Sequence, residues 1–119
     1  MEKNPNLGEF RDTKKQQRKN ARIRLTNLLG TFFLVSEKKE YECQILDLGT
    51  GGLGLSTKTL LYPGDKIIVK FWLEDQMFEL PSIVSRVSGK NVGVIFENIQ
   101  NKEIEKIQSF IHKNFFHKK

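Results

Sequence analysis

The chain has little of several residue types whose abundance would assign it to a particular class. Its 119 residues include one cysteine, one tryptophan, three prolines and two histidines. The single cysteine, Cys43, excludes an internal disulfide and is typical of a reducing, cytoplasmic compartment. No run approaches the roughly 18 consecutive apolar residues of a membrane span, and the N-terminus lacks the apolar stretch of a signal peptide. We therefore expect a cytoplasmic protein without membrane insertion.

Residues suited to catalysis or metal binding are also scarce. His112 and His117 are five positions apart on a predicted helix, whereas two ligands on one helical face need a spacing of three or four. Cys43 has no histidine near it in the sequence and is typical of a small core residue. No P-loop, nucleophile elbow or pair of carboxylates is present. The sequence predicts a protein that is not an enzyme and holds no metal or cofactor.

The net charge of +6 belongs to the two ends of the chain. Residues 1–24 contain eight Lys and Arg against three acidic residues, and residues 101–119 contain five against two. Residues 25–100 contain seven against nine. A nucleic-acid-binding domain more often spreads a basic face across its fold. A basic arm on a near-neutral domain favours a local anion site, so we expect no DNA or RNA partner. The alternative for the basic termini is nonspecific binding of RNA or DNA, which would be lost steeply with salt.

The apolar pattern predicts one domain built from short strands. Residues 1–17 are polar and lack apolar periodicity, which predicts a flexible basic leader before a domain over 18–119. Between residues 23 and 96, apolar residues alternate with polar ones in segments separated by turn signals at 63–65 and 88–91. Pro81 lacks an amide proton, so its strand should lie at an edge or bulge there. About six strands are expected.

The period changes near the C-terminus. Ile104, Ile107 and Ile111 recur at three and four, which predicts an amphipathic helix over about 101–116, capped by Asn98 or Asn101. Strands with tight turns followed by one helix indicate an all-β fold with a C-terminal helix. The expected architecture is a six-stranded antiparallel β-barrel, closed or nearly closed.

Two short segments are candidates for a binding site. Arg18 and Arg22 are four positions apart, and each guanidinium can bind a phosphate in a bidentate manner. The alternative for this segment is a solvated basic arm, or one that contacts RNA or acidic lipid nonspecifically. Further along the chain, Asp47 precedes a turn that contains Gly49, Gly51 and Gly52.

The glycines of that turn allow positive φ and close approach of a ligand to the backbone. The alternative is a tight or bulged turn that needs glycine for its geometry alone. Asp47 can cap the turn or accept hydrogen bonds from the N1–H and N2–H groups of a guanine. Together the two segments indicate a site for a small anionic ligand that also carries hydrogen-bond donors.

At these residues the sequence resembles the PilZ family, bacterial receptors for the second messenger cyclic di-GMP. The family pattern is R-x-x-x-R followed by D/N-x-S-x-x-G at the start of a barrel strand. Arg18 and Arg22 match the first element, while Asp47 and Gly52 match the ends of the second. A turn at 62–65, a strand at 92–96 and the terminal helix also fall where the family places them. The resemblance covers about residues 18–115 and implies a six-stranded barrel of the split-barrel kind.

The resemblance implies a role for each matched residue. Arg18 and Arg22 would clasp phosphate and guanine, Asp47 would read a guanine edge, and the Gly51 and Gly52 backbone would allow close approach. Arg86, by its position on a later strand, could stack its guanidinium on a base.

One position departs from the family pattern, because Gly49 stands where the motif has serine. Losing one hydroxyl contact costs about 0.5–1.5 kcal/mol to a neutral group and about 1.5–3 kcal/mol to a charged one. Since about 1.4 kcal/mol is tenfold in affinity, binding weakens without disappearing.

The implied function is that of a single-domain cyclic di-GMP receptor. Ligand binding would order the N-terminal arginine segment and transmit a signal to an unidentified protein effector. The alternative, suggested by Gly49, is a degenerate PilZ-like interaction module that binds no nucleotide. We expect a monomer or weak homodimer, because Phe110, Phe115 and Phe116 together exceed what one barrel needs to cover its end.

Overall fold

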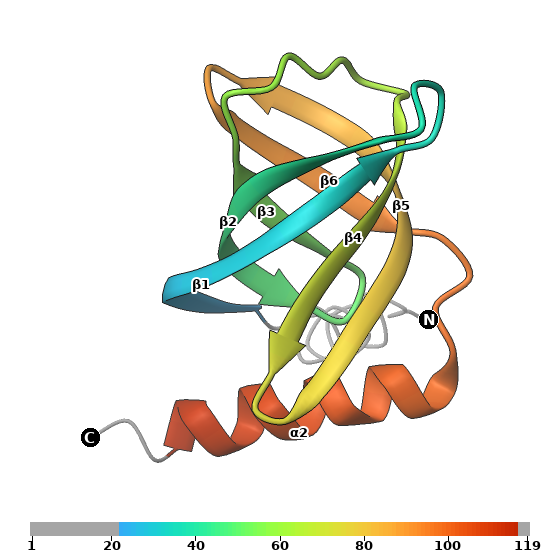
Figure 1. Ribbon diagram of the computed structural model, residues 1–119. Helices are drawn as coiled ribbons and strands as arrows, with labels where there is room; N and C mark the ends of the chain where they lie inside the picture. Colours follow the sequence, from blue (N-terminus) through green and yellow to red (C-terminus); the bar gives the residue numbers. More distant parts are fainter. Residues whose placement is uncertain (1–21, 117–119) are drawn as a thin grey trace, which may run out of the picture.

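The computed structural model describes residues 22–116, with side chains described for residues 22–114. This part of the chain forms six strands followed by one helix (Figure 1). The elements are β1 (Arg22–Leu34), β2 (Lys39–Gly49), β3 (Gly52–Ser56), β4 (Lys66–Leu73), β5 (Gln76–Ser88), β6 (Asn91–Phe96) and α2 (Asn101–Phe116).

The six strands form a closed antiparallel barrel in the order β1-β2-β3-β6-β5-β4. The predicted fold class, an antiparallel six-stranded barrel with a C-terminal helix, is therefore confirmed. Closure depends on the pairing of Gly30–Leu34 in β1 with Ile67–Phe71 in β4. The register with β4 involves only the second half of β1, so the first half of that strand is paired through β2 alone. This leaves the start of β1 at the outside of the barrel, next to the end of β2.

Alternate residues of each strand fill the barrel because successive side chains of a strand point to opposite faces. In β4 the four buried apolar residues are spaced by two, and they are Ile67, Val69, Phe71 and Leu73. The same alternation buries the apolar side of β5 and β6. The core also takes in residues from β1, β2 and β3, including Phe32, Ile45, Leu48, Leu53 and Leu55.

Pro81 was expected at an edge or a bulge, and β5 runs through this residue without a bulge, at a point where β6 no longer pairs with it. Pro81 lies in register with Ile68 of β4. Its carbonyl accepts a hydrogen bond from the Glu97 amide at 2.8 Å, so its nitrogen faces the side on which β6 has already ended. A proline nitrogen there leaves no ladder hydrogen bond unmade. The bulge of β5 lies further on, between Val84 and Arg86.

Helix α2 lies across one end of the barrel, where Ile107 and Ile111 are buried (Figure 1). Neither asparagine that was expected to cap the helix does so. The residue before the helix is Gln100, whose amide donates to Glu103 Oε1 at 3.2 Å and whose carbonyl accepts from the Ile104 amide at 2.9 Å. The bond from the Gln100 amide to Glu103 is one half of a capping box, and it satisfies an amide that precedes the first turn.

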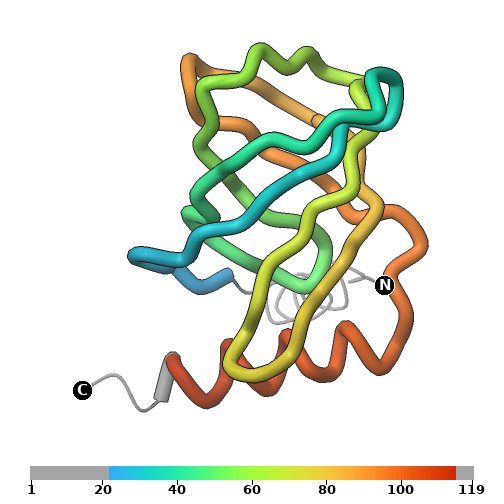
Figure 2. Tube along the Cα trace, viewed as in Figure 1, coloured from blue at the N-terminus to red at the C-terminus, as the bar shows by residue number. Residues whose placement is uncertain are grey.

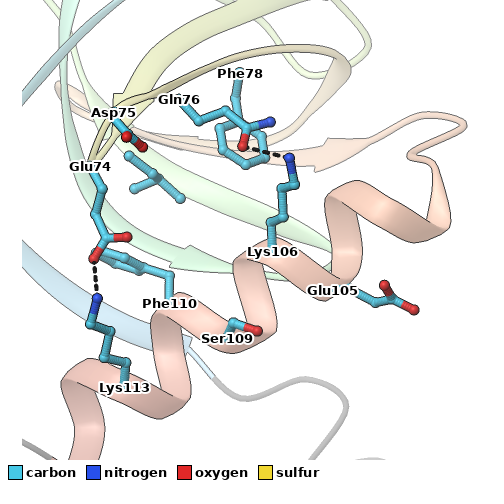
Figure 3. Close-up of a pocket in the computed structure, with 10 residues that line it drawn as sticks. Glu74, Asp75, Gln76, Phe78, Glu105, Lys106, Ser109, Phe110 and Lys113 are labelled. Atoms are coloured by element: carbon cyan, nitrogen blue, oxygen red, sulfur yellow. Dashed lines mark hydrogen bonds and ion pairs between the residues drawn. The ribbon is translucent and has the colours of Figure 1, made fainter.

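The β4–β5 hairpin extends past the barrel onto α2 (Figure 2). At its tip, Glu74 accepts a hydrogen bond from Lys113 Nζ at 3.0 Å, and Gln76 accepts one from Lys106 Nζ at 2.7 Å (Figure 3). A cleft of about 400 Å³ separates the hairpin from the helix, and the side chain of Phe110 lines it. Lys106 and Lys113, the two cations that line this cleft, both donate to the hairpin, so their contacts hold the hairpin and the helix together.

Candidate ligand-binding site

Asp47 and Arg22 meet on the outside of the barrel although they are 25 residues apart in the sequence. Asp47 lies near the end of β2, just after a bulge in the pairing of β2 with β3, and is in register with Arg24 of β1. The Arg22 guanidinium donates from Nη1 to Asp47 Oδ1. The two side chains are 45% and 30% exposed, so this ion pair is accessible to a ligand.

Only one of the two candidate arginines is placed. Arg18 and the predicted leader, residues 1–17, lie outside the residues that the structure describes. Arg22 is the first residue of β1, opposite Gly49 of β2. Arg22, the second arginine of the motif, therefore lies beside the glycine-rich turn.

The glycines of that turn differ in their surroundings. A Cβ atom added to Gly51 would meet nothing within 4 Å, and this residue is exposed. A Cβ atom added to Gly52 would collide with the carbonyl oxygen of Val94 in β6. Gly52 therefore allows β3 to approach β6, while the Gly51 backbone is open to solvent.

The glycines of this turn do not use the positive φ that glycine allows. Among the glycines of residues 22–116, only Gly64 and Gly89 have positive φ. Gly52 is required for its small size rather than for a left-handed backbone conformation.

Arg86 lies on β5 directly after the bulge at Val84, and its side chain is exposed. It forms no ion pair with the other residues that the structure describes. Gly93 of β6 lies opposite Arg86, and sequence reasoning missed this glycine. Its signal was an isolated glycine between two valines of a strand, a pattern that marks a close approach of another group to the backbone.

Within residues 22–116, no three His, Cys, Asp or Glu side chains come together as a metal site. The described helix is not long and apolar enough to cross a membrane. Cys43 is buried at 6% exposure, and burial raises the pKa of its thiol to about 12. A thiol with such a pKa is protonated and unreactive at neutral pH.

A closed six-stranded antiparallel barrel, covered at one end by a helix and carrying an arginine–aspartate pair outside, defines a small β-barrel domain. The family model for the PilZ domain matches residues 16–113. The chain belongs to the PilZ domain family.

Solved structures share this fold at low sequence identity. The PilZ domain of CeSA from a cellulose-synthesizing bacterium has a TM-score of 0.60 and 18% identity, and the match covers 81% of this chain and 98% of that one. The PilZ domain of YcgR from Escherichia coli, solved with c-di-GMP, has a TM-score of 0.67 and 15% identity, covering 82% and 91%. PlzA of Borreliella burgdorferi, in complex with c-di-GMP, has a TM-score of 0.64 and 17% identity, covering 87% of this chain but 45% of that one. Among curated proteins, no sequence matches the chain significantly.

Proposed function

We propose that this protein is a non-enzymatic receptor for cyclic di-GMP. The observation that carries the proposal is the accessible pairing of Arg22 with Asp47 beside the glycine-rich turn. It is supported by two similar structures, of YcgR and PlzA, that contain c-di-GMP. The arginine supplies a donor fork for phosphate or guanine, and the carboxylate supplies acceptors for the N1–H and N2–H groups of guanine.

The proposed site residues are Arg18, Arg22, Asp47, Gly49, Gly51, Gly52 and Arg86. Arg18 and Arg22 clasp the ligand, Asp47 reads a guanine edge, and Arg86 contacts a base. The open backbone at Gly51 gives the ligand room to approach.

Binding exchanges one ionic contact for others. A half-exposed ion pair such as Arg22–Asp47 contributes about 0–1 kcal/mol, whereas a hydrogen bond from a charged group to a buried ligand contributes about 1.5–3 kcal/mol. The ligand therefore gains more from these two groups than the ligand-free protein loses. Because Arg22 belongs to the arginine segment and is also the first residue of β1, ordering of that segment on binding can transmit a signal to a protein effector.

The alternative function is a PilZ-like interaction module that binds no nucleotide. Gly49 favours it, because the hydroxyl of the motif serine is absent. The two functions differ in one variant. The interaction module predicts that Gly49→Ser gains a nucleotide affinity that the parent lacks, whereas the receptor predicts binding by both proteins.

Titration calorimetry with cyclic di-GMP tests the proposal. We expect heat from the parent protein and an affinity about tenfold to about a hundredfold lower for Arg22→Ala, which loses a charge-assisted contact. Arg18→Ala is expected to act in the same direction. Lys58→Ala is the control, because it removes an exposed cation from the loop between β3 and β4. Absence of heat at high micromolar parent protein would reject the receptor function.

A further inference from the structure

Four residues form one row across four neighbouring strands. Asp47 of β2 is in register with Gly54 of β3, Gly54 with Gly93 of β6, and Gly93 with Arg86 of β5. The row therefore has a carboxylate at one end, a guanidinium at the other and two glycines between them. Residues in register across adjacent strands point to the same face, which here is the outside of the barrel.

Both charged side chains lie over the glycine next to them. A Cβ atom added to Gly54 would lie 2.6 Å from Asp47 Oδ2 and 3.2 Å from Asp47 Cγ. The Cβ position of Gly93 is 3.1 Å from Arg86 Nε, 3.2 Å from its Cγ and 3.4 Å from its Cζ. Three atoms at nearly equal distances mean that the Arg86 side chain runs flat across Gly93. Side chains at positions 54 and 93 would occupy the space that these two groups use.

The two carboxylate oxygens of Asp47 have different neighbours. Asp47 Oδ1 accepts from Arg22, while Oδ2 lies over Gly54, on the side that faces β6 and Arg86. Paired strands place Gly54 and Gly93 about 4.5–5.5 Å apart. The Asp47 carboxylate, an acceptor, and the Arg86 guanidinium, a donor, thus lie side by side on the sheet, about one strand spacing apart. No side chain lies between them, because both intervening residues are glycines. Ile95, two positions after Gly93 on the same face and 52% exposed, adds an apolar surface next to them.

The order of these groups matches one edge of a guanine. That edge carries O6, an acceptor, beside the N1–H and N2–H donors. The corresponding edge of adenine carries the N6 amino donor beside an acceptor, so it would set a donor against Arg86. We infer that Asp47 and Arg86 read a single guanine edge together, with Arg86 donating to O6, and that Gly54 and Gly93 are the positioning residues that hold both groups flat. The inference rests on the proposed function and adds Arg86 as a residue that determines the base specificity of that site.

Binding of three cyclic dinucleotides by the full-length protein tests this inference. We expect the parent to prefer cyclic di-GMP over cyclic di-AMP, with cyclic di-IMP, which keeps O6 and N1–H, in between. Arg86→Ala should lower cyclic di-GMP affinity about tenfold and reduce the preference over cyclic di-AMP. Gly93→Ala should act in the same direction, because the new methyl group displaces the Arg86 side chain. In the Arg86→Ala background, Gly93→Ala should have no further effect.

The controls separate positioning from loss of fold. The nearest atoms to an added Cβ at position 93 belong to the exposed Arg86 side chain, so Gly93→Ala is expected to fold, and thermal unfolding checks this. If it does not fold, Arg86→Ala and Arg86→Lys decide the inference through nucleotide preference alone. Lys58→Ala again controls for the loss of one positive charge.

Each result has one meaning. A parent that binds no cyclic dinucleotide overturns the proposed function and this inference together. A parent that binds, with Arg86→Ala unchanged in affinity and preference, overturns the inference alone. An Arg86→Ala variant that weakens both nucleotides equally assigns Arg86 to the phosphates and overturns the base reading. A Gly93→Ala effect that persists without Arg86 overturns the positioning role of the glycine.

Discussion

Truncation of Ile107 tests whether α2 is part of the barrel core. Ile107 is 0% exposed and lies in the middle of the helix that covers the barrel end. Ile107→Ala removes three carbon groups, a transfer loss of about 2.4 kcal/mol at about 0.8 kcal/mol each. The residual cavity adds to this loss, and comparable truncations cost about 2–5 kcal/mol. We therefore expect the free energy of unfolding to fall by about 3 kcal/mol.

Urea unfolding followed by circular dichroism measures this change, provided that the slope of the transition stays constant. The same loss lowers the melting temperature by about 10 °C in a domain of this size. Gln108→Ala is the matched control, because Gln108 is the exposed neighbour of Ile107 on the same helix, and alanine suits a helix at least as well. A loss below about 1 kcal/mol, or separate unfolding of the helix before the barrel, would refute the reasoning.

The surroundings of Gly52, Lys38 and Cys43 can be tested by substitution and by chemical reactivity. Gly52→Ala should lower the free energy of unfolding, measured in urea, by about 1–3 kcal/mol, because the added methyl group meets the Val94 carbonyl. Gly51→Ala is the control, because an added methyl group there meets nothing, and equal effects of the two substitutions would contradict the prediction. Lys38 has a φ of 54°, a conformation that glycine adopts more easily than other residues. Lys38→Gly should therefore raise the free energy of unfolding by about 0.5–1 kcal/mol and the melting temperature by a few degrees, whereas Lys38→Ala should not. The Cys43 thiol should react with Ellman's reagent at pH 8 only in denaturant, because burial raises its pKa to about 12. The folded state thus holds this proton more tightly, so stability relative to Cys43→Ala should fall as the pH rises from 9.0 towards about 12; a difference independent of pH would contradict this.

Much of the secondary structure and part of the site were predictable from local patterns. Alternation at Ile67, Val69 and Phe71 predicts a strand with one buried face, and all three are buried. The helical spacing of Ile107 and Ile111 likewise predicts the buried stripe of α2. These predictions succeed because the period of the apolar residues reflects the geometry of the element itself.

Features that depend on pairing between strands were not predictable in this way. The bulge of β5 lies between Val84 and Arg86 and not at Pro81. At Pro81, strand β6 has already ended on the side of the proline nitrogen, so no bulge is needed there. The glycines of the turn after β2 do not use the positive φ that glycine allows, and Gly52 is needed instead for its close contact with β6. In both cases the partner strand decides what the residue does, and the local sequence does not contain that information.

By itself, the sequence determined the class of this protein: alternating strands, a terminal helix, and an arginine and an aspartate suited to an anionic ligand with donor groups. Only the tertiary structure decided that Arg22 contacts Asp47 and that Asp47, Gly54, Gly93 and Arg86 form one row. The physical reason is that side-chain periodicity is a property of one strand. Register and barrel closure arise from hydrogen bonds between residues far apart in the chain, and a shift of one residue would turn every side chain of a strand to the other face.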